Sequence, residues 1–204
     1  MASTTRKGAV RAKSLEDRIV DTAIELAEER GGWDGLPLSR LADELGVSLG
    51  EVQGHFRDLD AVADAWFARA LKAMLKRQGK SFARLPARER LNKLILIWLD
   101  ALADHRQVTA KMLLTKMYPP HVHHWVPMIF NLSRTVQWLR DAAGLHRGIP
   151  HRQVEEIGLS ALFLAVLAVW GSDDTEGQRR TRRFLEKSLA AADRGMAGLF
   201  PSRG

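Results

Sequence analysis

Apolar residues recur at intervals of three and four along most of the chain, and this spacing restricts it to helical folds. Leu15, Ile19, Ala23 and Leu26 would share one helix face, whereas valine, isoleucine and threonine nowhere alternate with polar residues as they do in strands. The chain has 204 residues, enough to bury about 70 % of the surface that its unfolded form exposes. The sequence therefore predicts an all-α protein with its own hydrophobic core.

Capping residues predict where the first helices begin and end. Ser14, with Asp17 three residues later, marks the start of a first helix. The glycines at 31–32 mark its end, and Trp33 is expected to turn inward. Pro37 suits the first turn of a short second helix.

A turn between two short helices is the most specific local signal in the chain. Gly46 would end the second helix in the left-handed conformation, and Ser48 would cap a brief third helix over residues 49–56. Asp58 or Asp60 would open a longer fourth helix. Two short helices joined in this way fit a helix-turn-helix, whose second helix enters the major groove of DNA while the first braces it.

Further amphipathic segments, separated by prolines, would form a second and larger helical part. Asp173 and Glu176 have the spacing of a capping box and predict a final helix that ends at Gly195. The other expected helical segments are 91–104, 107–117, 128–143 and 152–170.

The chain is basic, with a net charge of +7, but this charge is unevenly distributed. Residues 16–60 hold twelve acidic and four basic side chains, a net charge of −8, whereas residues 61–120 have a net charge of +8. Basic proteins commonly bind nucleic acid or anionic membrane surfaces. Residues 1–14 are interpreted as a flexible basic arm, with a transit peptide as the alternative.

Six short stretches between residues 15 and 70 resemble the amino-terminal signature of the TetR/AcrR family of transcriptional regulators. They are Arg18-Ile19-Val20-Asp21-Thr22-Ala23, Glu29-Arg30-Gly31, Leu41-Ala42, Leu45-Gly46-Val47-Ser48, Gly50 and His55-Phe56. The resemblance implies a TetR-like all-α homodimer, with a helix-turn-helix DNA-binding domain at 15–59 and a ligand-binding and dimerisation domain at 60–204. It further implies double-stranded operator DNA and a small hydrophobic ligand as partners, a cytoplasmic repressor, no cofactor and no enzymatic activity.

The same resemblance assigns the residues that face DNA. Family members usually have a basic or polar residue where Leu49 stands, a threonine at Glu51 and a tyrosine at Gln53. Those groups donate hydrogen bonds to phosphates, whereas an ionised glutamate can only accept, for example from cytosine N4. The DNA-facing residues implied by position are Ser39, Arg40, Ser48, Leu49, Glu51, Gln53 and His55.

The carboxy-terminal half carries a second resemblance, to TetR-fold lipid-binding proteins of coenzyme Q biosynthesis that do not bind DNA. It rests on Leu167-Ala168-Val169-Trp170-Gly171-Ser172-Asp173-Asp174, on Thr181-Arg182-Arg183-Phe184-Leu185 and on the character of residues 125–138. It implies the alternative function, in which the protein presents a lipid to a partner enzyme.

Large apolar side chains are abundant in this half, and they suit either a plain core or the lining of a ligand pocket. The expected pocket residues are Trp98, Met112, Leu113, Met117, Trp125, Phe130, Trp138 and Phe163. Residues 157–170 are apolar on too many faces for a half-exposed helix, so we expect a second subunit to cover them, or else a central helix of a monomer. The expected dimer-interface residues are Ile157, Leu162, Val166, Trp170, Phe184 and Leu185.

Several chemistries find little support in the sequence. The chain has no cysteine, which excludes disulfides and thiolate metal sites and suits a reducing cytosol. His121, His123 and His124 follow two prolines, but their spacing favours a solvated loop over a metal site. Residues 157–170 are too few to cross a bilayer, and no phosphate loop or nucleophile motif is present.

A dense basic tract surrounds the expected connection between the fourth and fifth helices. It is a solvated face, a contact for anionic lipid headgroups, or a contact for DNA phosphates beside the reading helix. Its members are Lys72, Lys76, Arg77, Lys80, Arg84, Arg88, Arg90 and Lys93.

Overall fold

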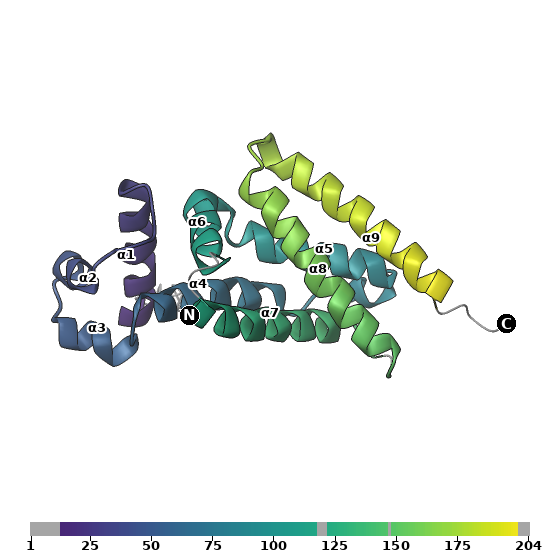
Figure 1. Cartoon of the computed structure of the whole chain (residues 1–204), viewed down its shortest axis with the longest axis horizontal. Coiled ribbons are helices and arrows are strands. Elements are labelled where there is room, and N and C mark those ends of the chain that lie inside the picture. The colour runs from purple at the N-terminus through teal and green to yellow at the C-terminus, as the bar shows by residue number, and fades with distance from the viewer. Residues whose placement is uncertain (1–12, 118–121, 147, 200–204) are drawn as a thin grey trace, which may run out of the picture.

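The computed structural model describes residues 13–117, 122–146 and 148–199, and every regular element in that part of the chain is a helix (Figure 1). The predicted all-α fold is therefore confirmed. The α-helices are α1 (Leu15–Glu29), α2 (Leu38–Leu45), α3 (Leu49–His55), α4 (Leu59–Met74), α5 (Ala87–Asp100), α6 (Arg106–Met117), α7 (Val122–Ala142), α8 (His151–Gly171) and α9 (Arg179–Leu199). Three 3₁₀ turns join them: η1 (Phe82–Arg84), η2 (Ala103–His105) and η3 (Glu176–Gln178).

The amino-terminal caps form as the sequence predicts. The Ser14 hydroxyl accepts a hydrogen bond from the Asp17 backbone N–H at 3.1 Å, which starts α1. Gly46 ends α2 with φ of 64°, the left-handed conformation that glycine adopts without strain. Of the two candidate aspartates it is Asp58 that caps α4, because its carboxylate accepts the Ala61 N–H at 2.7 Å.

Helices α1 to α3, residues 15–55, pack together as a small head, and α4 carries the chain from this head into the body (Figure 1). The inner face of α4 is buried as predicted, from Val62 through Trp66 to Met74. Arg69 of α4 donates to the carboxylate of Asp17 at 2.9 Å and to that of Asp21, so α1 is fixed to the middle of α4. Head and body are thus joined by both apolar packing and ion pairs.

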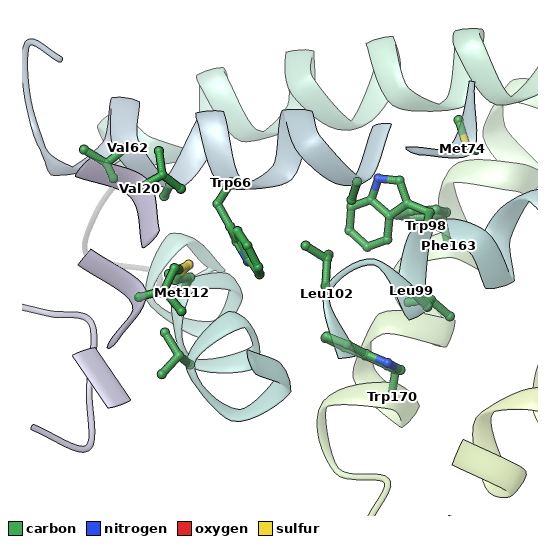
Figure 2. Packing of buried hydrophobic residues seen from close by; sticks show 14 of the residues in the cluster. Val20, Val62, Trp66, Met74, Trp98, Leu99, Leu102, Met112, Phe163 and Trp170 are labelled. Atoms are coloured by element: carbon green, nitrogen blue, oxygen red, sulfur yellow. The ribbon is translucent and has the colours of Figure 1, made fainter. Parts of the chain in front are cut away.

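The body consists of α4 to α9, and its core is built around large side chains from several helices. Figure 2 shows Trp98 of α5 beside Phe163 of α8, with ring centroids 5.0 Å apart at an interplanar angle of 71°. Trp170, near the end of α8, is fully buried next to Leu99. The indole N–H of Trp170 donates to Gln178 Oε1 at 2.9 Å, which ties the end of α8 to η3.

The turn between α8 and α9 differs from the predicted capping box. Asp173 is fully buried, and its carboxylate accepts hydrogen bonds from the backbone N–H and hydroxyl of both Thr175 and Thr181, at 2.6 to 3.0 Å. Glu176 instead begins η3, so α9 starts only at Arg179. Burial alone would raise the pKa of Asp173, but the hydrogen bonds from the two threonines outweigh it and hold this pKa well below its usual range.

Three other helices also differ from their expected ranges. Helix α5 covers Ala87–Asp100 rather than 91–104, because the chain turns after Asp100 and continues as η2. Helix α7 begins at Val122 rather than at residue 128, so it includes Pro127. Helix α9 continues through Gly195 to Leu199, because a glycine in an exposed helix costs only about 1 kcal/mol and does not by itself end it.

Helix α8 has the length and apolar composition of a membrane span, because it extends beyond the apolar run 157–170 at both ends. The core helix of a soluble protein can have the same length and composition, and α8 packs against α9 and α7. Near its start, Glu155 and Glu156 form ion pairs with the buried Arg140 of α7, at 2.9 and 3.2 Å. Of the 18 consecutive residues of α8 that are most apolar, only 28 % are buried in the protomer. Helix α8 therefore has an uncovered apolar face.

Candidate nucleic-acid interface and ligand cavity

Helices α2 and α3 present every predicted DNA-facing side chain to solvent. Apolar residues hold α3 against the head, with Val52 fully buried and Phe56 nearly so. Leu49, which begins α3, is 51 % exposed although it is a large apolar residue. The exposed residues on these two helices include Ser39, Arg40, Ser48, Leu49, Glu51, Gln53 and His55.

Glu51 has a structural role that the sequence analysis did not anticipate. Its Oε2 atom accepts the backbone N–H of Ser48 at 2.9 Å and the Ser48 hydroxyl at 2.8 Å, while the Ser48 hydroxyl oxygen accepts the Glu51 N–H at 3.2 Å. This reciprocal pair is a capping box. The hydrogen bond from the Ser48 backbone, followed by that from its hydroxyl, holds the pKa of Glu51 below its usual range. The carboxylate is therefore ionised at neutral pH and engaged at the start of α3.

An apolar cavity of about 720 Å³ lies in the body between α4, α5, α6, α7 and α8. Phe67 of α4 stacks on Trp98 of α5, with centroids 6.2 Å apart and an interplanar angle of 2°, and both line the cavity. Leu132 of α7 and Leu167 of α8 line it as well. Its volume and its apolar lining are those of small-molecule sites in proteins.

The predicted pocket residues divide into three groups. Trp98, Leu113 and Phe163 line the cavity. Met112 is fully buried but lies elsewhere in the core, near Val20 and Trp66 in Figure 2. Trp138 is 47 % exposed on α7 and does not line the cavity, because its side of the helix faces away from the core.

The other predicted pocket residues fall where side chains are not described. Met117, Trp125 and Phe130 lie within α6 and α7, and the structure describes their backbone alone. Sequence reasoning missed the contribution of α4, whose residues Asp64, Phe67, Ala68 and Leu71 line the cavity. These residues recur at intervals of three and four and form a second stripe on α4, beside the stripe that is buried. This periodicity is the sequence signal that could have placed α4 at the cavity.

The residues predicted for the dimer interface differ in how far they are buried within one protomer. Leu162, Val166, Trp170 and Leu185 are at most 8 % exposed, so they pack within the protomer itself. Ile157 is 72 % exposed. Phe184 is half-buried against the core.

The junction between head and body is made by α6 as well as by α4. His105, next to the start of α6, places its Nδ1 atom 2.9 Å from Glu28 Oε1 near the end of α1. Lys111 of α6 donates to the carbonyl oxygen of Gly31. Because α6 also lines the cavity with Ala110 and Leu113, one helix contacts both the cavity and the head.

Among the residues with described side chains, no group of three or more histidine, aspartate or glutamate residues could hold a metal ion. His123 and His124 lie in α7, contrary to the expected loop, but their side chains are not described. His121 lies outside the described residues.

The helix-turn-helix head and the helical body with its apolar cavity define an all-α helix-turn-helix protein. Among solved structures, the chain is similar to a TetR transcriptional regulator from Nitrosomonas europaea, with 40 % identity, a TM-score of 0.77, and 89 % of this chain and 99 % of that chain covered. It also aligns with AmtR from Mycobacterium smegmatis, at 19 % identity and a TM-score of 0.48 over 96 % of this chain and 97 % of that chain. No family model and no curated protein matches it.

At this identity and coverage the chain belongs to the TetR family of transcriptional regulators. The comparisons give no specific support to the lipid-presenting alternative.

Proposed function

We propose that this protein is a cytoplasmic homodimeric regulator that binds operator DNA through α2 and α3 and responds to a hydrophobic ligand held in the body, acting as a repressor. The observation that carries this proposal is the intact helix-turn-helix: a left-handed Gly46 between two short helices, and an outer α3 face that is exposed to solvent. Family membership supports it. The fold alone would not, because one fold serves many functions.

On DNA, α3 would lie in the major groove with its outer side chains against base edges. Leu49 offers an apolar contact for a thymine methyl group, and Gln53 offers an amide that can pair with adenine. Arg40 and Ser39 of α2 would contact phosphates. Since Glu51 uses Oε2 to cap α3, its charge lies at the helix start and weakens affinity for phosphate without reading a base.

Dimerisation would use the uncovered face of α8 together with α9. Ile157 is exposed there, and Gly158, Ala161 and Ala165 are exposed along the same side of α8. Burying this apolar face against the same face of a second copy is favourable and gives a two-fold interface. Two heads placed in this way would bind half-sites about 34 Å apart, one turn of DNA.

Ligand binding would act on the heads through the helices that contact both sites. Both α4 and α6 line the cavity; α4 bonds to Asp17 of α1, and α6 bonds to the carbonyl oxygen of Gly31 just after α1. A ligand that fits one arrangement of these helices better than another shifts the heads toward that arrangement, by no more than its difference in affinity. The proposed ligand is an apolar molecule that fits the cavity described above.

Selection of binding sites from random duplex DNA tests the proposal. We expect a palindromic sequence to be enriched, with affinity that falls as salt rises. Arg40→Ala should weaken binding to all sequences alike. It should also reduce the slope of log affinity against log salt concentration by about one, the value for one phosphate contact. The matched control is Arg180→Ala, which removes one exposed charge from α9. Failure to enrich any sequence, with folded dimeric protein, would refute the proposal.

A further inference from the structure

The positive charge of this chain is concentrated in one segment. Residues 72–93, named here the basic connection, contain eight basic residues and one acidic residue, Glu89. Their net charge of +7 equals that of the whole chain, so all other residues together are neutral. The basic connection covers the end of α4, η1 and the start of α5.

The basic side chains of this segment are free to meet a partner. All of them except Arg90 are exposed, and none of the exposed ones forms an ion pair with another described residue. Arg90 is half-buried, and its Nη1 atom lies 3.5 Å from the carbonyl oxygen of Ala83, across the turn. The connection thus presents seven uncompensated positive charges on an ordered segment.

The basic connection lies away from the reading helix α3. Helix α3 leads into the first turn of α4, and α1 is held as far along α4 as Arg69, whereas the connection starts at the last turn of the same helix (Figure 1). An α-helix of 16 residues is about 24 Å long. The two surfaces therefore lie at opposite ends of α4.

The side chains within the connection fit a bilayer better than a nucleic acid. Its one aromatic residue, Phe82, is 8 % exposed and packed in the core, so no ring is available to stack on a base. Leu75, in contrast, is 36 % exposed and lies between Lys72, Lys76 and Arg77. An apolar side chain surrounded by long cationic ones can enter the headgroup region while the charges meet anionic lipids.

The basic connection also adjoins the apolar cavity. Leu71 lines the cavity, and Leu75 follows one helical turn later on the same side of α4. An apolar surface therefore continues from the cavity wall toward the exposed end of the helix.

We propose that the basic connection is a docking surface for an anionic lipid bilayer, with Leu75 entering the headgroup region and the surrounding lysines and arginines binding lipid phosphates. The seven exposed cations supply the attraction, and clusters of four to eight Lys and Arg residues commonly bind anionic membranes. This surface is separate from α3 and from the uncovered face of α8. The proposal stands whether or not the head binds DNA.

Sedimentation of the whole chain with lipid vesicles tests whether the positive charges of the basic connection are needed for binding. The protein should bind vesicles of phosphatidylcholine with about one third phosphatidylglycerol, and bind pure phosphatidylcholine weakly. Replacing Lys76, Arg77 and Lys80 together by glutamine should weaken binding on the order of 100-fold, since each charge near a membrane contributes roughly fivefold. The matched control replaces Arg179, Arg180 and Arg183, also exposed, by glutamine and should change binding little. Equal losses in both variants would overturn the proposal.

A second measurement separates a bilayer from other polyanions. Because the chain has no cysteine, Leu75→Cys can carry a single environment-sensitive dye. Its emission should shift to the blue with anionic vesicles and stay unchanged with random duplex DNA or polyglutamate. A dye at Glu44→Cys, on the exposed face of α2, is the control and should not shift. The proposal would also be overturned if the protein labelled at position 75 bound vesicles with no shift in dye emission, or if duplex DNA shifted the emission equally.

Discussion

The indole N–H of Trp66 in α4 donates a hydrogen bond to the hydroxyl of Thr109 in α6 at 3.0 Å, inside the core. Trp66 is 7 % exposed and Thr109 is fully buried, and the Thr109 hydroxyl donates in turn to the carbonyl oxygen of His105 at 2.8 Å. Since α4 and α6 both contact the head and both line the cavity, this polar bond sets the position of one helix against the other.

Thr109→Val should destabilise the protein by about 1–3 kcal/mol, because the isosteric change leaves the buried indole N–H of Trp66 without an acceptor. Chemical denaturation followed by circular dichroism measures the free energy of unfolding. Ser172→Ala is the matched control, since that exposed hydroxyl, just after α8, donates to carbonyl oxygens in the last turn of α8. Equal stability of Thr109→Val and wild type would show that the bond is not important.

The buried carboxylate of Asp173 should make the protein sensitive to acid. Its folded pKa is lowered, so its contribution to stability is fully present above the unfolded value of about 3.9 and is lost as the pH falls below that value. Asp173→Asn should cost about 2–3 kcal/mol at neutral pH and should flatten the fall in stability below pH ~4. Denaturation curves over a pH series measure both effects. An unchanged slope in the variant would contradict this assignment.

Glu51→Gln should raise operator affinity several-fold without changing the selected sequence, because the amide oxygen can still accept from Ser48 while the negative charge is removed. Site selection followed by binding titration tests both parts. Glu44→Gln removes one charge from the exposed face of α2 and controls for net charge. A change in the preferred base at any one position would instead show that Glu51 reads DNA.

Gln53→Ala should reduce the preference for one base pair in each half-site by about tenfold, as expected for the loss of a bidentate contact with adenine. The comparison is between binding to the selected operator and to operators changed at single positions. Uniform weakening over all these operators would place Gln53 against the phosphate backbone.

Ala168→Phe should fill part of the cavity and weaken binding of the apolar fluorescent probe N-phenyl-1-naphthylamine at least tenfold. Ala101→Phe adds the same ring at an exposed position at the end of α5 and serves as the control. Probe fluorescence measures the affinity. Equal binding by both variants would mean that the probe occupies another site.

The helices and their amino-terminal caps could be predicted because they depend on local chemistry. Ser14, Ser48 and Asp58 each bond to a backbone N–H three residues later, and Gly46 adopts the conformation that other residues avoid. The predicted capping box at Asp173 and Glu176 was wrong because the aspartate instead accepts hydrogen bonds from Thr175 and from Thr181, which is eight residues away. A tertiary contact thus displaced a local one.

The cavity was harder to predict than the helices. Periodicity indicates which side of a helix is apolar, but not whether that side meets the core, an empty space or solvent. Trp98 and Trp138 are alike in the sequence, yet the first lines the cavity while the second is exposed. Ser48 and Glu51 have the sequence spacing of a capping box, so the capping role of Glu51 could have been predicted. The family resemblance placed Glu51 among the DNA-facing residues instead.

The carboxylate of Asp173 influences the molecule beyond its own surroundings. Its four hydrogen bonds fix the turn in which α8 reverses into α9, and α8 carries the uncovered apolar face. A small change in this turn would tilt one helix against the other and alter the fit between two copies of the chain. Substitutions at Asp173, Thr175 or Thr181 that leave the fold intact should therefore change the dimer dissociation constant, although none of these side chains need touch the other subunit.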